Sequence, residues 1–327
     1  MREVKKVKFT GFPRYHDPRK QSYYDMLSGR YDLVECEDPD YVLDGGQSFE
    51  HEKYDAVKIL ICSENVVPDF NAYDYAIASS ELDFGDRYLR IPWYVFSPGY
   101  NELIERRQVD DGALLNRKFC SFVVSNSEFA DPMRQKFFKR LSAYKRVDSG
   151  GRFMNNVGGL VKDKQTFCQG YKFNIAFENS SQPGYVTEKI MDAYWAHSIP
   201  IYYGSATVDR DFNAKSMVWV RNEGDIERAI DEIIFLDNDD AAYLKMASEP
   251  CWGKSFDPRI YLTKMHDFLY SIFDRPLPEA RRLASYGYQA MIHRHLRYLR
   301  LMDYRLRKSL AFRLLTKIAS RVRSAGK

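Results

Sequence analysis

Short apolar runs that alternate with amphipathic segments constrain the fold of this chain more than any other feature. Apolar runs predict strands at residues 119–124, 173–177, 199–203 and 217–220. Segments with helical periodicity lie between and after them, at residues 132–143, 187–197 and 226–236. Strands that alternate with helices over short connections are typical of a doubly wound parallel sheet. We therefore expect an α/β domain in this part of the chain.

The first hundred residues predict a second set of strands. Apolar runs at residues 5–9, 31–35, 56–62 and 75–78 are too short for helices and are separated by polar turns. Residues 100–116 are charged and lack apolar periodicity, so we expect a linker there. A chain of 327 residues can build two domain cores. The expected organisation is three segments: a Rossmann-like domain at 1–112, another at 113–275, and a C-terminal helical segment at 276–327.

Positive charge is concentrated at the C-terminus. The net charge is only +4, but residues 291–327 carry 11 basic residues and one acidic residue. No glycine or proline interrupts the chain between Gly287 and Gly326, which predicts one long helix. Its apolar residues recur every three or four positions, at Leu299, Met302, Leu306, Leu310, Leu314, Ile318 and Val322. A basic amphipathic helix fits an anionic membrane surface or a partner helix, and its apolar stripe disfavours nucleic acid as a partner.

Several protein classes are excluded by what the sequence lacks. No apolar run is long enough to span a membrane, and no signal-peptide pattern follows the first residues. The five cysteines are widely spaced, so neither a disulfide framework nor a zinc site is expected. Two acidic clusters, 38–40 and 237–240, resemble metal-binding pairs, but the second fits a helix N-cap better. We expect a cytoplasmic protein that is peripheral on the inner membrane.

Residues 171–205 carry the most chemical information. A buried strand ends in a polar loop, and a helix is expected to begin at Thr187, so free backbone N–H groups would form an anion site there. Lys189 adds a positive charge, Tyr185 a hydroxyl donor, and Glu188 an acceptor for ribose hydroxyls. This pattern fits a nucleotide diphosphate. In the alternative interpretation, Thr187 and Glu188 only cap a helix and Lys189 is solvated; the residue types alone leave both open.

The same segment resembles the donor-binding signature of the family 10 glycosyltransferases, the α-1,3/4-fucosyltransferases. The matching motifs are Phe177-Glu178-Asn179, Gly184-Tyr185-Val186-Thr187-Glu188-Lys189 and Ile199-Pro200-Ile201-Tyr202-Tyr203-Gly204. Residues 63–70 resemble the family's GEN-x-x-P element, with Ser63 where glycine is usual, and residues 83–92 resemble the bacterial branch. The resemblance covers roughly residues 55–250.

The resemblance implies a GT-B fold, in which two Rossmann-like domains face a central cleft and a basic C-terminal helix follows. It implies inverting transfer of fucose from GDP-β-L-fucose to GlcNAc of an N-acetyllactosamine-type acceptor, such as a lipopolysaccharide O-antigen or Lewis-type glycan. No cofactor is required, although Mn²⁺ or Mg²⁺ could stimulate the reaction. The alternatives are a GT-B enzyme with another nucleotide sugar or an α-1,4 linkage, and a non-catalytic membrane-associated scaffold.

An inverting displacement needs a carboxylate that takes the acceptor proton and positive charge that stabilises the leaving GDP. Glu64, just beyond a predicted buried strand, is the candidate catalytic base, although alone it would also fit a surface loop acid. Arg134 and Lys189 are expected to neutralise the diphosphate, and Asn179 and Tyr185 to add hydrogen bonds. For Arg134 the alternative is a solvated arginine on a helix face.

Overall fold

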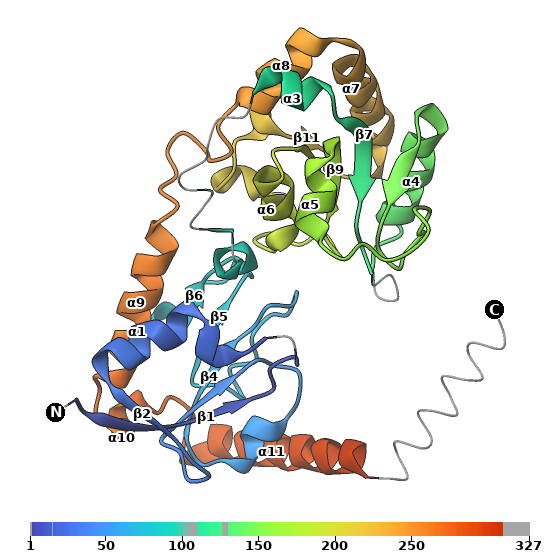
Figure 1. Cartoon of the computed structure of the whole chain (residues 1–327). Coiled ribbons are helices and arrows are strands. Elements are labelled where there is room, and N and C mark those ends of the chain that lie inside the picture. The colour runs from blue at the N-terminus through green and yellow to red at the C-terminus, as the bar shows by residue number, and fades with distance from the viewer. Residues whose placement is uncertain are drawn as a thin grey trace. The chain divides into compact units, whose positions relative to one another are not determined.

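The computed structural model describes residues 2–14, 16–97, 99–100, 103, 110–125 and 130–309 (Figure 1). They form two compact units. Unit 1 contains the residues up to Ala78, Leu82–Leu89, and those from Thr263 onward, whereas unit 2 contains Ser79–Glu81 and Arg90–Leu262. Each unit is built on its own sheet with helices around it. The expected α/β class with two Rossmann-like units is thereby confirmed.

The unit 1 sheet has the strand order β2-β1-β3-β4-β5-β6. Its strands are β1 (Val4–Thr10), β2 (Asp32–Glu35), β3 (Tyr41–Asp44), β4 (Val57–Ile61), β5 (Tyr75–Ala78) and β6 (Tyr88–Arg90). Strands β1 to β5 pair in parallel, and every residue of β3, β4 and β5 is buried. Continuous burial is typical of a parallel sheet covered on both faces, which is why these strands are unbroken apolar runs.

The helices of unit 1 come from both ends of the chain. They are α1 (Ser22–Arg30), α9 (Ile260–Phe273), α10 (Leu277–Ala280) and α11 (Gly287–Lys308). In α9, Met265, Leu269 and Phe273 are fully buried, and the Phe273 ring stacks on Tyr41 of β3 at 4.2 Å between centroids. The segment after residue 262 therefore completes the core of the N-terminal sheet. We had expected the second domain to extend to residue 275, with a separate helical segment after it.

Unit 2 has a five-stranded sheet in the order β11-β10-β9-β7-β8, and all its paired strands are parallel. The strands are β7 (Lys118–Phe122), β8 (Val147–Ser149), β9 (Tyr171–Phe177), β10 (Ile199–Tyr203) and β11 (Val218–Trp219). The helices are α3 (Asp111–Leu115), α4 (Met133–Tyr144), α5 (Lys164–Gln169), α6 (Glu188–Trp195), α7 (Ile226–Asn238) and α8 (Asp240–Ser248). Helix α3 occupies part of the stretch that we predicted to be a linker.

Helix α11 is shorter than the predicted C-terminal helix, and it leaves the apolar stripe partly exposed. It ends at Lys308, and residues 310–327, with the remaining predicted stripe positions, lie outside the described part of the chain. The stripe residues Leu299, Met302 and Leu306 are about half exposed, at 48%, 51% and 55%. The buried face instead contains Ala290 and Tyr304. None of the helices in the described residues is long and apolar enough to cross a membrane.

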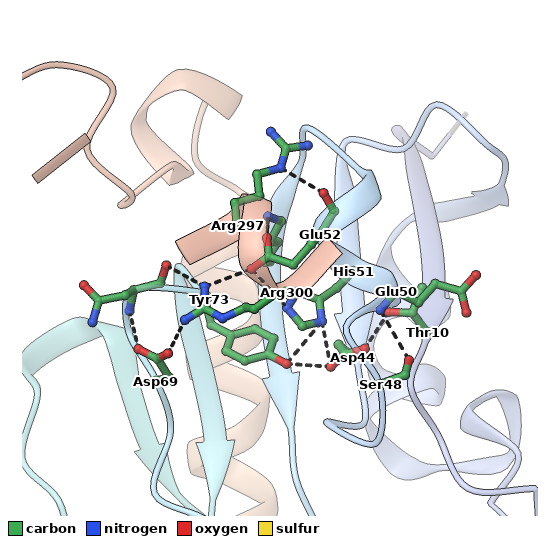
Figure 2. A network of polar contacts seen from close by, with 12 residues as sticks. Thr10, Asp44, Ser48, Glu50, His51, Glu52, Asp69, Tyr73, Arg297 and Arg300 are labelled. Atoms are coloured by element: carbon green, nitrogen blue, oxygen red, sulfur yellow. Dashed lines mark hydrogen bonds and ion pairs between the residues drawn. The ribbon is translucent and has the colours of Figure 1, made fainter. Parts of the chain in front are cut away.

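Two arginines attach α11 to unit 1 (Figure 2). Arg300 lies 3.0 Å from the Glu52 carboxylate, which is only 2% exposed, and it also pairs with Asp69. The Arg297 Nε donates to the backbone carbonyl of Glu52 at 2.8 Å. Lys58 forms a further 2.8 Å ion pair with Glu52. Arg297 and Arg300 therefore face the body of unit 1, because the buried carboxylate of Glu52 needs compensating positive charge.

Replacement of Arg300 by alanine should destabilise unit 1. The change leaves the buried Glu52 carboxylate with less compensation, which costs about 3 kcal/mol of unfolding free energy for a buried pair. Urea titration followed by circular dichroism measures the loss. The matched control is Arg307→Ala on the same helix, because Arg307 is 66% exposed and pairs only within α11, with Asp303. Equal stability of the two variants would contradict the assigned role of Arg300.

Candidate active site

The strand order of unit 2 predicts where a ligand binds. Strand β7 lies between β8, which follows it in sequence, and β9, which comes later, so the direction of strand addition reverses between β7 and β9. In open α/β sheets, ligands bind beyond the carboxyl ends of the strands at such a switch point. Glu178 and Asn179 directly follow β9. The motif that the sequence singled out therefore lies at the switch point.

The carboxylate of Glu178 joins the end of β9 to the start of α6. Its side chain is fully buried and accepts hydrogen bonds from the Thr187 backbone N–H at 2.7 Å and from the Thr187 hydroxyl at 2.8 Å. Lys189 Nζ lies 3.0 Å away as its counter-charge. Thr187 occupies the N-cap position of α6, but its hydroxyl donates to Glu178 and accepts no hydrogen bond from a backbone N–H of the helix. The predicted capping by the Thr187 side chain is therefore wrong.

Lys189 is held rigidly and is not solvated. Its side chain is 16% exposed, and its ammonium group donates to Glu178 at 3.0 Å and to the Thr187 hydroxyl at 2.8 Å. Burial lowers the pKa of Lys189, but the charges of Glu178 and Glu188 outweigh burial and raise the pKa above its ordinary value. The ammonium group thus stays charged. The alternative of a solvated lysine is wrong.

Arg134 lies in the first turn of α4 and is 1% exposed. Its Nε and Nη2 donate to the backbone carbonyl of Phe177, at 3.2 and 2.6 Å, so the guanidinium group lies at the end of β9. Burial lowers the pKa of Arg134, and the nearby Glu178 and Glu188 oppose that shift. A guanidinium remains protonated under such shifts. The alternative of a solvated arginine on the helix face is wrong.

The remaining predicted donor-site residues surround the same strand end. The backbone carbonyl of Asn179 accepts from the Asp131 N–H at 2.7 Å, and the side chain of Tyr185 is buried near Arg134. Glu188 is the most accessible of the group, with a side chain 43% exposed. Burial raises the pKa of Glu188, but the positive charges of Lys189 and Lys164 lower it below its ordinary value. The carboxylate of Glu188 is therefore an ionised hydrogen-bond acceptor near two positively charged side chains, those of Lys189 and Lys164.

Two glycines of the motif are required by close packing, one against Glu178 and one against Ser79. A Cβ atom on Gly204 would lie 2.5 Å from Cγ of Glu178. Gly184 adopts a φ of +86°, and a Cβ there would lie 2.3 Å from the Ser79 carbonyl oxygen. The Gly184 N–H also donates to the Ser205 hydroxyl at 2.9 Å. Gly204 therefore leaves room for the buried Glu178 side chain, and Gly184 allows the loop to approach the Ser79 backbone.

Glu64 lies in unit 1, three residues after β4 ends at Ile61, at the carboxyl edge of the sheet. Its side chain is exposed, and its carboxylate has no partner among the described residues. Two acids that are near Glu64 in the sequence have partners. Glu81 pairs with Arg210 at 3.0 Å, and Asp83 accepts from the Gly85 N–H at 3.2 Å. Glu64 is therefore the carboxylate in this region that is free to accept a proton.

Sequence analysis missed Asp44, which lies at the switch point of unit 1. The strand order reverses between β1 and β3, and Asp44 is the last residue of β3. Its buried carboxylate accepts from the Thr10 hydroxyl at 2.6 Å and the Tyr73 hydroxyl at 2.7 Å, and it lies 3.3 Å from Nδ1 of His51 (Figure 2). The only local signal was the turn that Gly45 and Gly46 predict after an apolar run. Asp44 belongs to the same network as the Glu52 contacts of α11.

No group of three or more His, Cys, Asp or Glu side chains within the described ranges is arranged to hold a metal ion. In the acidic cluster at 237–240, Asp239 caps α8 by accepting from the Ala242 N–H at 2.9 Å. The N-cap interpretation of that cluster is confirmed.

Comparison with known proteins gives two matching family models. Residues 7–97 match the "Alpha-(1,3)-fucosyltransferase FucT N-terminal domain", and residues 115–270 match "Glycosyltransferase family 10 (fucosyltransferase) C-term". The chain is 36% identical over 265 residues to "Alpha-(1,3)-fucosyltransferase FucT" of Helicobacter pylori, a match that covers 69% of this chain and 55% of the relative. It is 30% identical over 166 residues to "Putative fucosyltransferase R654" of Acanthamoeba polyphaga mimivirus, covering 46% of this chain and 26% of that one. The chain thus spans about half or less of the length of these curated relatives.

Solved structures are similar over most of their length. The crystal structure titled "alpha1,3-Fucosyltransferase with GDP-fucose" superposes with a TM-score of 0.70 at 31% identity, covering 84% of this chain and 92% of that one. The structure of an α1,3-fucosyltransferase with GDP gives a TM-score of 0.71 at 32% identity, with 84% and 91% covered. These are GT-B structures, so the predicted GT-B fold class is confirmed.

Replacement of Glu178 by alanine should strongly destabilise unit 2. Loss of the carboxylate leaves Lys189 partly buried without its closest counter-charge and removes the acceptor of the Thr187 N–H, which together cost about 3–5 kcal/mol. All four tryptophans, at positions 93, 195, 219 and 252, lie in unit 2, so urea titration followed by tryptophan fluorescence reports on this unit.

The control for this prediction is Glu188→Ala. The Glu188 carboxylate is 43% exposed and lies 3.5 Å from Lys189, so its removal should change the unfolding free energy by less than about 1 kcal/mol. If the two variants unfold at the same urea concentration, the contacts of Glu178 do not stabilise the connection between β9 and α6.

Proposed function

The chain belongs to glycosyltransferase family 10, the fucosyltransferases, and from this membership we propose that it is an inverting α-1,3-fucosyltransferase. The donor is GDP-β-L-fucose, and the acceptor is the GlcNAc residue of an N-acetyllactosamine-type glycan. One observation carries the proposal: two largely buried cations, Arg134 and Lys189, meet at the switch point of unit 2 beside the start of α6. A leaving nucleoside diphosphate needs positive charge and N–H donors of this kind.

The donor-side residues divide the recognition of GDP-fucose between them. An ammonium group has three N–H donors, and Lys189 uses two of them on Glu178 and Thr187. The third would donate to a phosphate oxygen; in the structure the ammonium group also lies 3.5 Å from the Glu188 carboxylate. Arg134 adds a second positive charge, and Glu188 accepts from the ribose hydroxyls. Asn179 and Tyr185 complete the site with amide and hydroxyl groups.

Glu64 supplies the base on the acceptor side. As the bond to fucose forms, the acceptor hydroxyl loses its proton, and a carboxylate within reach accepts it. Glu64 fits this role because its carboxylate is exposed and unpaired among the described residues, at the strand edge where parallel sheets bind ligands. The bond between the anomeric carbon of fucose and GDP breaks as the new bond forms on the opposite face, so the configuration inverts and GDP leaves with the bonding electrons. The proposed step requires no metal ion, although Mn²⁺ or Mg²⁺ could stimulate it by screening the diphosphate.

The setting of the reaction is part of the proposal. The exposed face of α11 combines Met302 and Leu306 with Arg305 and Arg307, a combination that suits an anionic membrane surface. We place the protein in the cytoplasm, peripheral on the inner membrane, with a lipopolysaccharide O-antigen or Lewis-type glycan as the acceptor.

A donor competition tests the proposed function. The chain is incubated with N-acetyllactosamine and equal amounts of GDP-fucose and GDP-mannose, and the product is examined by mass spectrometry. We expect the mass of one added deoxyhexose. Addition of a hexose would mean that the protein uses a different nucleotide sugar as its donor. An unmodified acceptor would favour a non-catalytic scaffold.

Replacement of Glu64 by glutamine should slow fucosyl transfer without weakening the binding of the donor. Glutamine keeps the shape of the side chain but cannot accept the proton, and loss of a general base lowers the rate about 10²- to 10⁴-fold. Steady-state kinetics measures turnover, and calorimetry measures GDP affinity, which should stay unchanged. Asp83→Asn serves as the control, since Asp83 is an exposed acid of the same unit. A Glu64 variant with near-normal turnover would exclude it as the base.

Replacement of Lys189 or Arg134 by glutamine should weaken the binding of GDP. Each cation is proposed to contact the diphosphate, and a charged hydrogen bond contributes roughly 1.5–3 kcal/mol, or about 10- to 150-fold in affinity. Glutamine preserves a hydrogen-bonding side chain, which limits the loss of stability. Calorimetric titration with GDP measures the effect, and Lys215→Gln, an exposed lysine of unit 2, is the control. If both folded variants bind GDP as tightly as the parent, the nucleotide binds at a different place on the protein.

A further inference from the structure

A second candidate site lies in unit 1, away from the residues assigned to fucosyl transfer. A cavity of about 240 Å³ lies between α11 and the residues that precede β4 and β5. Asp55 and Ala56 come just before β4, and Asp74 just before β5, so the cavity is at the amino ends of these strands. Glu64 follows the opposite end of β4. The cavity is far larger than the roughly 15 Å³ that one water needs.

The three carboxylates of the cavity wall already have partners. Glu52 pairs with Lys58 at 2.8 Å and with Arg300 at 3.0 Å. Asp55 pairs with Arg281 at 2.6 Å. Asp74 accepts from three backbone N–H groups, those of Lys58, Arg282 and Leu283, at 2.8, 2.6 and 2.9 Å. The acids of the wall are therefore poor candidates for holding a cation.

Two guanidinium groups of the wall lack such partners. Arg294 and Arg297 are three positions apart on α11, so they lie on one face of the helix. Their Nε atoms donate to backbone carbonyls, those of Ala290 at 3.3 Å and Glu52 at 2.8 Å. Neither arginine forms an ion pair within the described residues. Both residues line the cavity, and two guanidinium forks match the oxygens of a phosphate.

His293 contributes a third unused donor. Gln289 Nε2 lies 2.9 Å from Nε2 of His293, and an amide nitrogen can only donate, so Nε2 of the histidine is the acceptor. In the neutral ring the hydrogen is therefore on Nδ1. Nδ1 is buried and has no hydrogen-bond partner in the described part of the chain. A buried donor left unpaired is costly, and an anion in the adjoining cavity would remove that cost.

We propose that this cavity binds a phosphate group through Arg294, Arg297 and His293. The phosphate is either free, as an inorganic or small-molecule phosphate, or the headgroup of a lipid. A lipid source fits the surroundings of Arg294, because Met291 and Tyr298 lie three and four positions away on the helix and are 51% and 61% exposed. Acyl or prenyl chains could contact these side chains while the phosphate enters the cavity.

The test compares two double variants of the full chain that remove the same charge from unit 1. Arg294→Gln with Arg297→Gln changes the cavity, and Lys20→Gln with Lys264→Gln changes exposed positions outside its wall. Calorimetric titration with inorganic phosphate and with pyrophosphate is done at saturating GDP, so that the proposed donor site does not contribute. A parallel flotation assay compares vesicles of phosphatidylcholine with and without phosphatidic acid.

We expect the parent and the exposed-position variant to bind phosphate alike and the cavity variant to bind at least tenfold more weakly. If only phosphatidic acid vesicles separate the two variants, the site takes a lipid headgroup. If only the free ions separate them, it takes a soluble phosphate. Absence of saturable binding by the parent in both assays, or equal losses in both variants, would overturn the proposal. Because transfer activity is not measured, these outcomes are independent of the proposed function.

Discussion

The buried carboxylate of Glu178 is the interaction on which the donor end of this protein depends. A fully buried charge must be compensated, and here Lys189 and two donors of Thr187 do so within 3.0 Å. These contacts hold the strand end and the helix start together, which places Arg134 and Lys189 at one switch point. They also explain Gly204, where any side chain would collide with Glu178. The signature motif thus also has a structural role, because its residues compensate the charge of one buried carboxylate.

Much of the sheet structure could be predicted from the sequence because buried parallel strands are short, unbroken apolar runs. β5 and β10 have the bounds that we predicted. The four residues of β3 were missed because they are followed at once by a turn. The return of α9 to unit 1 could not be predicted either, since it depends on contacts such as Phe273 with Tyr41, which are more than 200 positions apart. Contacts of that range leave no local pattern.

In the candidate site too, features that depend on neighbouring residues could be predicted, whereas contacts between distant residues could not. The motif placed Asn179, Tyr185, Glu188 and Lys189 correctly around one strand end, but it did not reveal that Glu178 pairs with Lys189. In the C-terminal helix, the apolar stripe at Leu299, Met302 and Leu306 is about half exposed, whereas Arg300 pairs with the buried carboxylate of Glu52. The sequence did not reveal that pair, because the two residues are more than 200 positions apart.

The central claim is that the two units together transfer fucose with inversion, and proton NMR tests it most directly. The chain is mixed with GDP-β-L-fucose and N-acetyllactosamine, and the anomeric signals are followed with time. The account predicts that the β-fucosyl signal of the donor falls while an α-fucosyl signal linked to O3 of GlcNAc rises at the same rate. A β-linked product, or a donor signal that persists unchanged, would contradict it.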